Sequence, residues 1–293
     1  MSQATTNLAA LLPSAAGNLI KRQAFGIAIT SYPSILGSDV SGVVAAVGSA
    51  VTSFQAGDRV LGSCDGIATG NPDHAAFQTY SVVSATSASK LPATLAFKDA
   101  ATLATAVGTA AVALFDALGL PAPDTKPSKA ESGNLGILVW GGASSVGSAT
   151  VQLARLAGLK VFAAASPKYH DHVRSLGAIE VVDYRSPTAV DDLVAATQGT
   201  GIDITLAMDF RGPKKVAKPD GIEAVWIRGD KLWNQRRDLS GVLYNELLSG
   251  WLEAGEVVPG KARVVEGGLG RLQAALDELK TGVISGEKLV VEL

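Results

Sequence analysis

The stretch "LVWGGASSVGSATVQLA", residues Leu138–Ala154, decides the fold class of this chain. Its first residues are apolar and predict a buried strand that ends at Trp140, and the pattern from about Ser148 onward predicts a helix. A turn rich in glycine and serine lies between the two. Proteins bind the diphosphate of a dinucleotide in such a strand–turn–helix context, because the helix N-terminus supplies N–H donors and a positive dipole end.

Three residues of this turn occupy the positions of the dinucleotide fingerprint G-x-G-x-x-G: Gly142, Ser144 and Gly147, with serine in place of the middle glycine. We expect Gly142 to permit the tight turn and Gly147 to let the helix pack close to the strand. At Ser144 a small side chain still lets a pyrophosphate approach. Many strand-to-helix turns use glycine only for its backbone freedom, but the surrounding strands and helices favour a cofactor site here.

The alternation of strands and helices continues beyond this turn. The apolar segments "LGILVW", "KVFAAA", "IEVVD" and "IDITLAM" predict four strands, and helical spacing fills the gaps between them. Uniformly apolar strands that alternate with helices indicate a parallel sheet covered on both faces. We therefore predict an α/β fold with a Rossmann-type, doubly wound parallel sheet.

The first third of the chain is rich in short strands and glycine turns instead. Small and β-branched residues alternate in Gly37–Val51, Phe54–Gly62 and Ala76–Val83. This pattern predicts a small β-barrel or sandwich. The apolar run Ala100–Phe115 follows. It is shorter than the roughly 20 residues that a membrane span needs, so we expect a buried helix.

Composition narrows the class of protein. The 293 residues are 47% hydrophobic and carry a net charge of -2, without a basic stripe, so nucleic acid is not an expected partner. The single cysteine, Cys64, excludes an intramolecular disulfide and is most simply an inert thiol. The first basic residue is Lys21, so the charged start of a signal peptide is missing. We expect a soluble, cytoplasmic protein without a membrane partner.

The end of the second predicted strand indicates which dinucleotide binds. Enzymes that use NAD carry Asp or Glu there, to accept from the ribose 2′-hydroxyl. This chain has Ser166 and Lys168 instead, with no carboxylate before Asp171, and Tyr184 follows the third strand. Hydroxyl groups and a cation suit the 2′-phosphate of NADPH, although Lys168 alone would also fit a surface lysine at a helix start.

These residues resemble the medium-chain dehydrogenase/reductase superfamily, specifically its zinc-independent enoyl reductase branch. That branch includes the fungal trans-acting enoyl reductases that serve polyketide synthases. The matching strings cover most of the chain in the expected order: "YPSILGSDVSGVVAAVGSAVTSFQAGDRVLG", "AFQTYSVV", "GILVWGGASSVGSATVQLARLAG", "ASPKYHDHVRSLGAIEVVDY" and "GGLGRLQAALDELKTGVISGEKLVVEL".

The resemblance implies a set of cofactor-binding residues. The pyrophosphate would lie against the turn, at Gly142, Ser144, Ser145, Val146 and Gly147. The adenosine 2′-phosphate would lie among Ser166, Pro167, Lys168, Tyr169 and Tyr184. Near the C-terminus, Ile284 and Ser285 resemble residues that fold back onto the cofactor.

The resemblance also implies catalytic and substrate residues. Lys21 is similar to the lysine that ends the family string N-P-x-D-W-K, close to the reacting centre, and Thr109 to the threonine near the nicotinamide. The helix that carries this threonine would form part of the substrate wall, through Thr109, Ala110, Ala111, Val112 and Phe115.

The chain departs from the family pattern in three places. Zinc-dependent relatives carry Gly-His-Glu where this chain reads Gly37-Ser38-Asp39, and with one Cys and three His neither zinc site can be built, so we expect no metal. The opening strands and the Asn-Pro-x-Asp residues before Lys21 are absent. A helix, a strand and a nicotinamide-flanking loop are absent after Met208-Asp209, which predicts a truncated Rossmann-type sheet.

These interpretations predict a GroES-like, β-rich catalytic domain over residues 1–122 and 257–293 and an NADPH-binding domain over 123–256. The expected reaction is reduction of the C=C bond of an α,β-unsaturated carbonyl compound or thioester, free or tethered to a carrier, with a polyketide synthase as partner. An NADPH:quinone reductase and a degenerate, non-catalytic relative are the alternatives. The chain would be a monomer or a homodimer.

Overall fold

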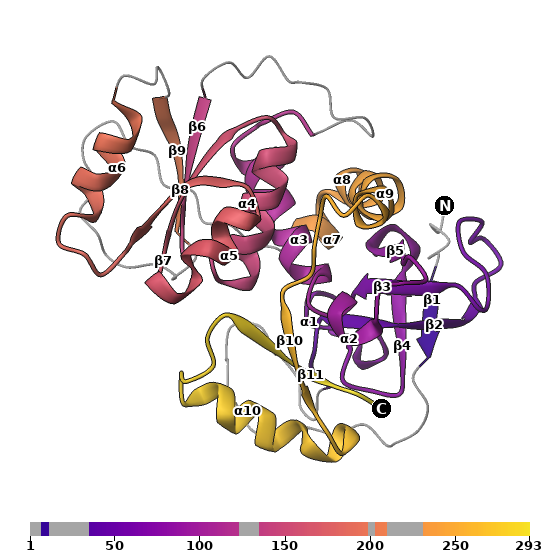
Figure 1. Cartoon of the computed structure of the whole chain (residues 1–293). Coiled ribbons are helices and arrows are strands. Elements are labelled where there is room, and N and C mark those ends of the chain that lie inside the picture. The colour runs from indigo at the N-terminus through magenta and orange to yellow at the C-terminus, as the bar shows by residue number, and fades with distance from the viewer. Residues whose placement is uncertain (1–6, 12–34, 123–134, 199–202, 210–230) are drawn as a thin grey trace. The chain divides into compact units, whose positions relative to one another are not determined.

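The computed structural model describes five stretches of the chain (Figure 1): residues 7–11, 35–122, 135–198, 203–209 and 231–293. The chain divides into two compact units. We call unit 1 the residues Met1–Gly108, Asp230–Gly255 and Pro259–Leu293. We call unit 2 the residues Thr109–Gly229 and Glu256–Val258.

Unit 2 contains the predicted parallel sheet. Its strands lie in the order β8-β7-β6-β9, and every neighbouring pair is parallel. Their bounds are Leu135–Trp140 for β6, Lys160–Ala165 for β7, Ala178–Asp183 for β8 and Asp203–Asp209 for β9. The four predicted strands are therefore confirmed, and their order places the turn after β6 at the centre of the sheet.

Helices cover both faces of this sheet, as the uniformly apolar strands predict. Figure 1 shows α6 (Ala189–Thr197) on one side and α4 (Ser145–Leu156) with α5 (His170–Ser175) on the other. Successive residues of β7 face opposite sides of the sheet. Phe162 belongs to the buried cluster that contains Leu193 of α6. Ala163 and Val173 of α5 both lie close to Gly142 on the other face. The 3-10 turn η4 (Pro167–Tyr169) joins β7 to α5.

A short return of the chain completes unit 2. Residues Glu256–Val258 cluster with unit 2, although their neighbours on both sides belong to unit 1. The side-chain amide of Gln152 on α4 forms two hydrogen bonds with the main chain of Val258. Its Nε2 donates to the Val258 carbonyl oxygen at 3.2 Å, and its Oε1 accepts from the Val258 N–H at 2.8 Å. Arg155 donates to the carbonyl oxygen and the carboxylate of Glu256, at 2.8 and 2.7 Å. The helix that follows the glycine-rich turn therefore also fixes this return.

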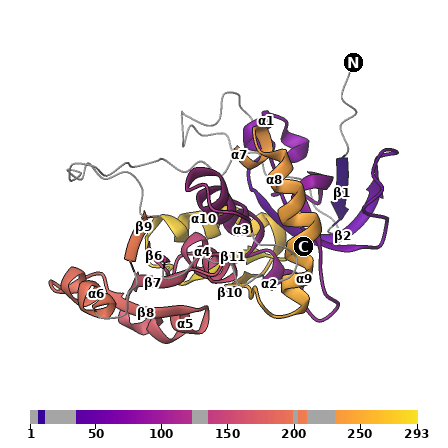
Figure 2. The same ribbon diagram turned by 90° about the horizontal axis from the view of Figure 1, so that it is seen from above.

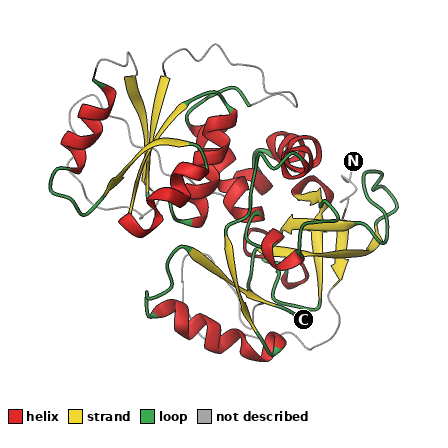
Figure 3. Ribbon diagram, viewed as in Figure 1, coloured by secondary structure: helices red, strands yellow, loops and turns green. Residues whose placement is uncertain are grey.

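Unit 1 begins with an antiparallel sheet in the order β4-β1-β2-β3-β5 (Figure 3). Its strands are β1 (Asn7–Leu11), β2 (Asp39–Val47), β3 (Arg59–Ser63), β4 (Tyr80–Ser84) and β5 (Ala88–Lys90). Three of these lie inside the segments predicted to be β-rich or overlap them. Strand β1 was not predicted from the sequence, and it pairs with both β2 and β4.

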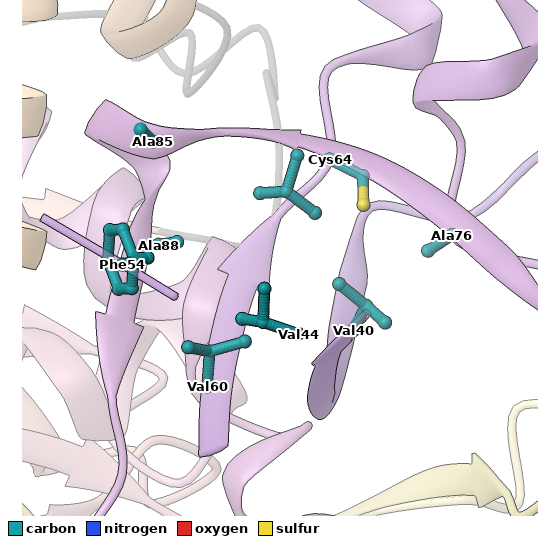
Figure 4. Close-up of a cluster of buried hydrophobic side chains, with 9 residues drawn as sticks. Val40, Val44, Phe54, Val60, Cys64, Ala76, Ala85 and Ala88 are labelled. Atoms are coloured by element: carbon teal, nitrogen blue, oxygen red, sulfur yellow. The ribbon is translucent and has the colours of Figure 1, made fainter. Parts of the chain in front are cut away.

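Alternating residues of these strands build the core of the sheet (Figure 4). The cluster contains Val40 and Val44 of β2, Val60 of β3, Phe54 and the thiol of Cys64. Each of these side chains is at most 6% exposed, so the cysteine is packed as a small apolar residue. Short helical turns connect the strands: α1 (Gly66–Thr69), η1 (Pro72–His74) and η2 (Ala85–Ser87).

The apolar run after β5 is helical and buried, as predicted. It comprises α2 (Phe97–Ala100), α3 (Ala104–Ala111) and the π-helical turn η3 (Val112–Ala117). By length and composition, Phe97–Ala117 is the one helix of the described chain that could cross a membrane. However, 72% of its most apolar window is buried inside the protein, which is the property of a core helix.

The helical segment after residue 230 belongs to unit 1, which shifts the expected domain boundary. It consists of α7 (Lys231–Asn234), α8 (Arg237–Gly241), the π-helical turn η5 (Val242–Leu247) and α9 (Leu248–Glu253). The last three form one continuous ribbon in Figure 2. We expected residues 123–256 to form one domain with the parallel sheet, but the contacts of residues 230–255 lie with the β-rich unit.

Polar side chains explain why residues 230–255 belong to unit 1. Ser240 donates to the carbonyl oxygen of Thr86 at 2.9 Å, and Asn245 donates to two carbonyl oxygens, of Ala85 and Ala88. Tyr244 is fully buried, and its hydroxyl donates to the carbonyl oxygen of Ala104 at 2.7 Å. Hydrogen bonds from one helix to main-chain carbonyls of distant residues leave no pattern in the sequence, so the hydrophobic periodicity did not reveal them.

The C-terminal part of unit 1 is a strand–helix–strand element. Strands β10 (Lys261–Val265) and β11 (Glu287–Val291) pair in parallel. The turn η6 (Gly268–Arg271) and helix α10 (Leu272–Lys280) connect them.

The contact between Tyr244 and helix α3 yields a prediction for stability. A Cβ at Gly108 would lie 2.5 Å from the Tyr244 hydroxyl oxygen and 2.9 Å from Leu232 Cδ2. We expect Gly108→Ala to lower the free energy of unfolding by about 1–3 kcal/mol because it overpacks this core. Denaturant unfolding measures the change.

The matched control is Gly250→Ala, because a Cβ at that helical glycine would meet nothing within 4 Å. This control should raise stability by up to about 1 kcal/mol through helix propensity. In a Tyr244→Phe background the penalty of Gly108→Ala should shrink, because the colliding oxygen is gone. Equal stability of Gly108→Ala and Gly250→Ala would contradict the packing described.

Candidate functional site

The turn between β6 and α4 begins with a glycine in the left-handed region. Gly141 has a φ of +92°, and the amides of Gly141 and Gly142 both donate to the carbonyl oxygen of Ala164 at 3.0 Å. The residue that permits the tight turn is therefore Gly141. We expected this role for Gly142, which does not have a positive φ.

Gly142 and Gly147 are needed for close packing instead. A Cβ at Gly142 would lie 3.1 Å from both Ala163 Cβ and Val173 Cγ1, where the turn meets β7 and α5. A Cβ at Gly147 would collide with the carbonyl oxygen of Gly141. This contact agrees with the expected role of Gly147 in close packing of the helix. Because the contact is with the main chain of Gly141, no side-chain rotation could relieve it.

Helix α4 begins at Ser145, three residues earlier than the sequence pattern predicted. Ser144 is its N-cap, and its side-chain oxygen accepts a hydrogen bond from the Gly147 N–H at 3.0 Å. No acceptor among the described residues bonds the N–H groups of Ser145 and Val146. The exposed start of a twelve-residue helix therefore presents two unused donors at its positive dipole end.

The ends of β7 and β8 bring two of the predicted residues together. The Ser166 hydroxyl, only 9% exposed, donates to the Tyr184 hydroxyl oxygen at 3.2 Å. This hydrogen bond, with a smaller contribution from the Arg185 guanidinium, lowers the pKa of Tyr184 below its ordinary value. Surroundings that lower the pKa of a phenol favour negative charge on its oxygen.

Two cations are close to this pair in the sequence, Lys168 after Ser166 and Arg185 after Tyr184. Lys168 is exposed in η4, with its ammonium 4.8 Å from the ring centroid of Tyr169. The guanidinium of Arg185 lies 5.2 Å from the ring centroid of Tyr184. No ion pair to either cation is formed within the described part of the chain. Arg185 was not predicted as a site residue, although its position directly after Tyr184 in "VVDYR" is a signal that could have found it.

The other predicted residues are distributed over the chain. Lys21 lies outside the described residues. Thr109 is partly buried on α3, and Phe115 and the three residues Ala110–Val112 belong to the core, the last three with no exposed surface. Ile284 and Ser285 lie in unit 1, in the connection from α10 to β11. Their catalytic, substrate and cofactor roles stay predictions.

The described side chains that could ligate a metal or act as a nucleophile are far apart, buried or paired with a charged side chain. In the stretches that the structure covers, no three His, Cys, Asp or Glu side chains lie close enough to hold a metal ion. Cys64 is 1% exposed, and burial, followed by the charges of Asp39 and Asp65, raises the pKa of its thiol. His74 pairs with Asp65 at 2.8 Å. The thiol is therefore inert, as expected.

Comparison with known proteins identifies relatives along most of the chain. The alcohol dehydrogenase GroES-like domain family matches residues 10–93, which lie in unit 1. A trans-enoyl reductase of Aspergillus japonicus is 35% identical over 89% of this chain and 82% of its own length. A trans-enoyl reductase of Aspergillus flavipes is 34% identical over 89% of this chain and 83% of its own length.

A solved structure with the same fold is the Escherichia coli quinone oxidoreductase complexed with NADPH. It is 18% identical and superposes with a TM-score of 0.67 over 99% of this chain and 94% of its own. The two-part architecture, a GroES-like unit with a unit built on a parallel sheet, is therefore a known fold, and the predicted fold class is confirmed.

The contact between Gly147 and Gly141 yields a second prediction. Gly147→Ala forces the main chain of the turn to shift, and we expect it to lower the free energy of unfolding by about 1–3 kcal/mol. Thermal or denaturant unfolding measures it. Gly241→Ala is the control, because a Cβ there would meet nothing within 4 Å. A fully stable Gly147→Ala variant would mean that the turn does not have this geometry.

The hydrogen bond between Ser166 and Tyr184 yields a third prediction, on the pKa of Tyr184. In Ser166→Ala the donor is lost, so the pKa of Tyr184 should rise toward the ordinary value of about 10. An alkaline titration of tyrosinate absorbance detects the change, and Tyr184→Phe identifies which step belongs to this residue. If the same step appears at the same pH in wild type and Ser166→Ala, the two hydroxyls do not interact.

Proposed function

The chain belongs to the medium-chain dehydrogenase/reductase family, and we propose that it is an enoyl reductase that uses NADPH. It reduces the carbon–carbon double bond of an α,β-unsaturated carbonyl compound or thioester. The observation that carries the proposal is identity of 35% and 34%, each over 89% of this chain, to two proteins named trans-enoyl reductases. The same fold in a quinone oxidoreductase complexed with NADPH supports a nicotinamide cofactor.

The turn after β6 fits the diphosphate of such a cofactor. An anionic oxygen satisfies the two donors that the described residues leave unused, the N–H groups of Ser145 and Val146, and the dipole of α4 favours its charge. The Ser144 side chain is exposed beside them while it caps the helix. The N-cap bond of Ser144 keeps the first helical turn in place before any ligand arrives.

The ends of β7 and β8 fit a 2′-phosphate better than a free 2′-hydroxyl. Ser166 stands at the end of β7, where an NAD enzyme carries a carboxylate. Its hydroxyl and that of Tyr184 supply hydrogen bonds, and Lys168 and Arg185 supply positive charge without an ion-pair partner among the described residues. The nearest acid, Asp183, already accepts from the Arg185 N–H at 3.0 Å. These features support NADPH over NADH.

The reaction moves one hydride and one proton. When bound, NADPH would supply the hydride that adds to the β-carbon of the substrate, and the electron pair of the double bond would pass to the carbonyl oxygen. A donor beside that oxygen stabilises the resulting enolate, and Lys21 and Thr109 are the residues that we propose for this role. The α-carbon takes its proton from solvent. Binding by the chain contributes most by holding substrate and nicotinamide in one orientation.

The substrate class and the partner follow from the relatives. A trans-acting enoyl reductase works on a chain that a separate protein holds, so we propose a carrier-tethered enoyl thioester as substrate and a polyketide synthase as partner. We propose that the protein works in the cytoplasm together with this synthase. Quinone reduction is the second enzymatic candidate. It has less support, because the two relatives reported above, at 35% and 34% identity, are named trans-enoyl reductases, whereas the quinone oxidoreductase of the same fold is 18% identical.

Two assays test the proposal. Oxidation of NADPH is followed with a crotonyl thioester and, separately, with a quinone; faster turnover of the thioester supports enoyl reduction, and the reverse result replaces it with quinone reduction. Binding of NADPH is followed by nicotinamide fluorescence and by thermal shift. Absence of turnover with retained binding would indicate a non-catalytic relative, and absence of binding would refute the cofactor site.

The 2′-phosphate site yields a fourth prediction. Ser166→Asp puts a carboxylate where the phosphate would lie, and Lys168→Met removes a charge-assisted bond. Each should weaken NADPH binding by about tenfold or more and leave NADH binding almost unchanged. The ratio of the two dissociation constants measures this selectivity.

Lys160→Met is the matched control for the lysine. Lys160 is exposed at the opposite end of the same strand β7, so its loss should leave the ratio unchanged. If Lys168→Met and Lys160→Met give the same selectivity, Lys168 is an ordinary surface lysine.

A further inference from the structure

Three neighbouring strands of unit 2 end in similar turns at one edge of the parallel sheet. Each turn is closed by a hydrogen bond of 2.9 Å from the N–H of its fourth residue to the carbonyl oxygen of its first. The turns are Gly141–Ser144 after β6, Ser166–Tyr169 after β7 and Asp183–Ser186 at the end of β8. Because β6, β7 and β8 are parallel neighbours, their ends lie side by side, about 4.8 Å from one strand to the next.

The first turn offers main-chain donors to an anion. It leads directly into α4, where the N–H groups of Ser145 and Val146 have no acceptor among the described residues. The amides of Gly141 and Gly142 are already used, because both donate to the carbonyl oxygen of Ala164 on β7. The same two bonds fix the first turn against the strand that leads to the second.

The second and third turns each carry a cation at their third residue. Lys168 has this position in the turn after β7, and Arg185 has it in the turn at the end of β8. Both side chains are exposed, and neither forms an ion pair with the described residues. The two turns begin almost level, since Ala165 and Asp183 are partners in the β7–β8 ladder. Two unpaired cations therefore stand on adjacent strand ends.

A hydrogen bond between hydroxyl groups joins these two turns. Ser166, the first residue of its turn and only 9% exposed, donates to the Tyr184 hydroxyl oxygen at 3.2 Å. Because the oxygen of Tyr184 accepts this bond, its own proton is available for another acceptor. The edge thus has two anion-binding parts within one unit, the start of α4 and the paired turns. A ribose with one phosphate at its 5′ position and another on its 2′ or 3′ edge fits such a pair.

These paired turns hold no group that requires a free 3′-hydroxyl on the ribose. Enzymes that bind both ribose hydroxyls use a carboxylate at the end of the second strand, and Ser166 follows that strand here. The carboxylate of Asp183 accepts from the Arg185 N–H at 3.0 Å. A protein excludes a competing ligand by a clash or by a polar group that the competitor leaves unpaired. Lysine instead adapts, because its ammonium has three donors on a flexible stem.

We infer that this edge of unit 2 also binds the adenosine 3′,5′-bisphosphate end of coenzyme A, in competition with NADPH. The 5′-phosphate lies at the start of α4, and the 3′-phosphate takes the place of the 2′-phosphate beside Lys168 and Arg185. This inference rests on the proposed cofactor site and is independent of the proposed reaction. All the groups that it uses belong to unit 2.

The competition would separate two kinds of thioester substrate. A coenzyme A thioester carries the competing nucleotide, so at high concentration it displaces the NADPH that its own reduction needs. A thioester on a carrier protein contains no nucleoside and leaves the cofactor site free. The inferred site therefore favours delivery of the substrate on a carrier.

Calorimetry on the full chain tests the nucleotide site without turnover. The ligands are adenosine 2′,5′-bisphosphate, adenosine 3′,5′-bisphosphate and, as the reference without a ribose phosphate, 5′-AMP. We expect both bisphosphates to bind about tenfold or more tightly than 5′-AMP, because the second phosphate gains charge-assisted hydrogen bonds. Coenzyme A should displace NADPH, as followed by nicotinamide fluorescence. Dephospho-coenzyme A, which lacks only the 3′-phosphate, should be about tenfold weaker or more.

Variants of the two cations show whether the phosphates share one place. Lys168→Met and Arg185→Met should each weaken both bisphosphates by a similar factor of about tenfold. Binding of 5′-AMP should stay within about twofold, which also shows that the variants are folded. Lys160→Met is the matched control, because Lys160 is exposed at the opposite end of β7, and it should change neither bisphosphate.

Kinetics provide a second test. Crotonyl-coenzyme A should inhibit its own reduction at high concentration, and added NADPH should relieve the inhibition. The crotonyl thioester of N-acetylcysteamine, which has no nucleotide, should not inhibit. Inhibition by crotonyl-coenzyme A that NADPH does not relieve would place the coenzyme elsewhere and overturn the inference.

The remaining outcomes separate this inference from the proposed function. Tight binding of the 2′,5′-bisphosphate with a 3′,5′-bisphosphate no better than 5′-AMP would overturn the inference and leave the NADPH site standing. Equal displacement of NADPH by coenzyme A and dephospho-coenzyme A would also overturn it. Failure of both bisphosphates and of NADPH to bind would refute the cofactor site and the inference together. Binding of both bisphosphates by a protein that reduces no enoyl substrate would support the inference and refute the proposed reaction.

Discussion

The carbonyl oxygen of Gly141 occupies the place where a side chain at residue 147 would stand, and unit 2 depends on that contact. It lets α4 start after a turn of only four residues, so that Ser144 caps the helix and the next two N–H groups have no acceptor in the described part of the chain. The same helix holds the returning segment Glu256–Val258 through Gln152 and Arg155. Loss of this one close approach would move the anion-binding donors and the return of the chain together.

Unit 1 is organised differently, by polar side chains that reach main-chain carbonyls or amides. Ser240, Tyr244 and Asn245 attach one helix to the sheet and to α3. Asp39 attaches α3 to the start of β2. Each of these bonds is at least partly buried, so an unsatisfied partner would carry a desolvation cost. Such bonds specify one arrangement of the segments more narrowly than apolar packing does.

Much of unit 2 could be predicted from sequence, because its signals are local. The four strands, the helices between them and the neighbouring positions of Ser166 and Tyr184 follow from periodicity and from the rule that parallel strands end at one edge. The role of Gly141 was misassigned to Gly142, because Gly142 has the fingerprint spacing to Gly147 and the sequence does not show which of the two adjacent glycines takes the left-handed backbone angle. Arg185 was missed although it adjoins a predicted residue.

The long-range contacts of unit 1 could not be predicted, because the partners of a side-chain bond to a carbonyl can be any residue type. The ion pair of Asp39 and Lys288 spans 249 positions, and no pattern in the sequence links them. Strand β1 and the membership of residues 230–255 in unit 1 were not predicted for the same reason, because their partners lie far away in the sequence. Lys21 and residues 210–230 lie outside the described residues, so the catalytic role of Lys21 stays a prediction from the resemblance.

Unit 1 is assembled from three separate stretches of chain, whereas nearly all of unit 2 comes from one. A growing chain therefore makes the antiparallel sheet and α3 well before Tyr244 and Lys288, which bond to them across 140 and 249 positions. Unit 2 can complete its parallel sheet in the meantime, because its contacts close over shorter loops. Unit 1 is in this way begun before unit 2 and completed after it.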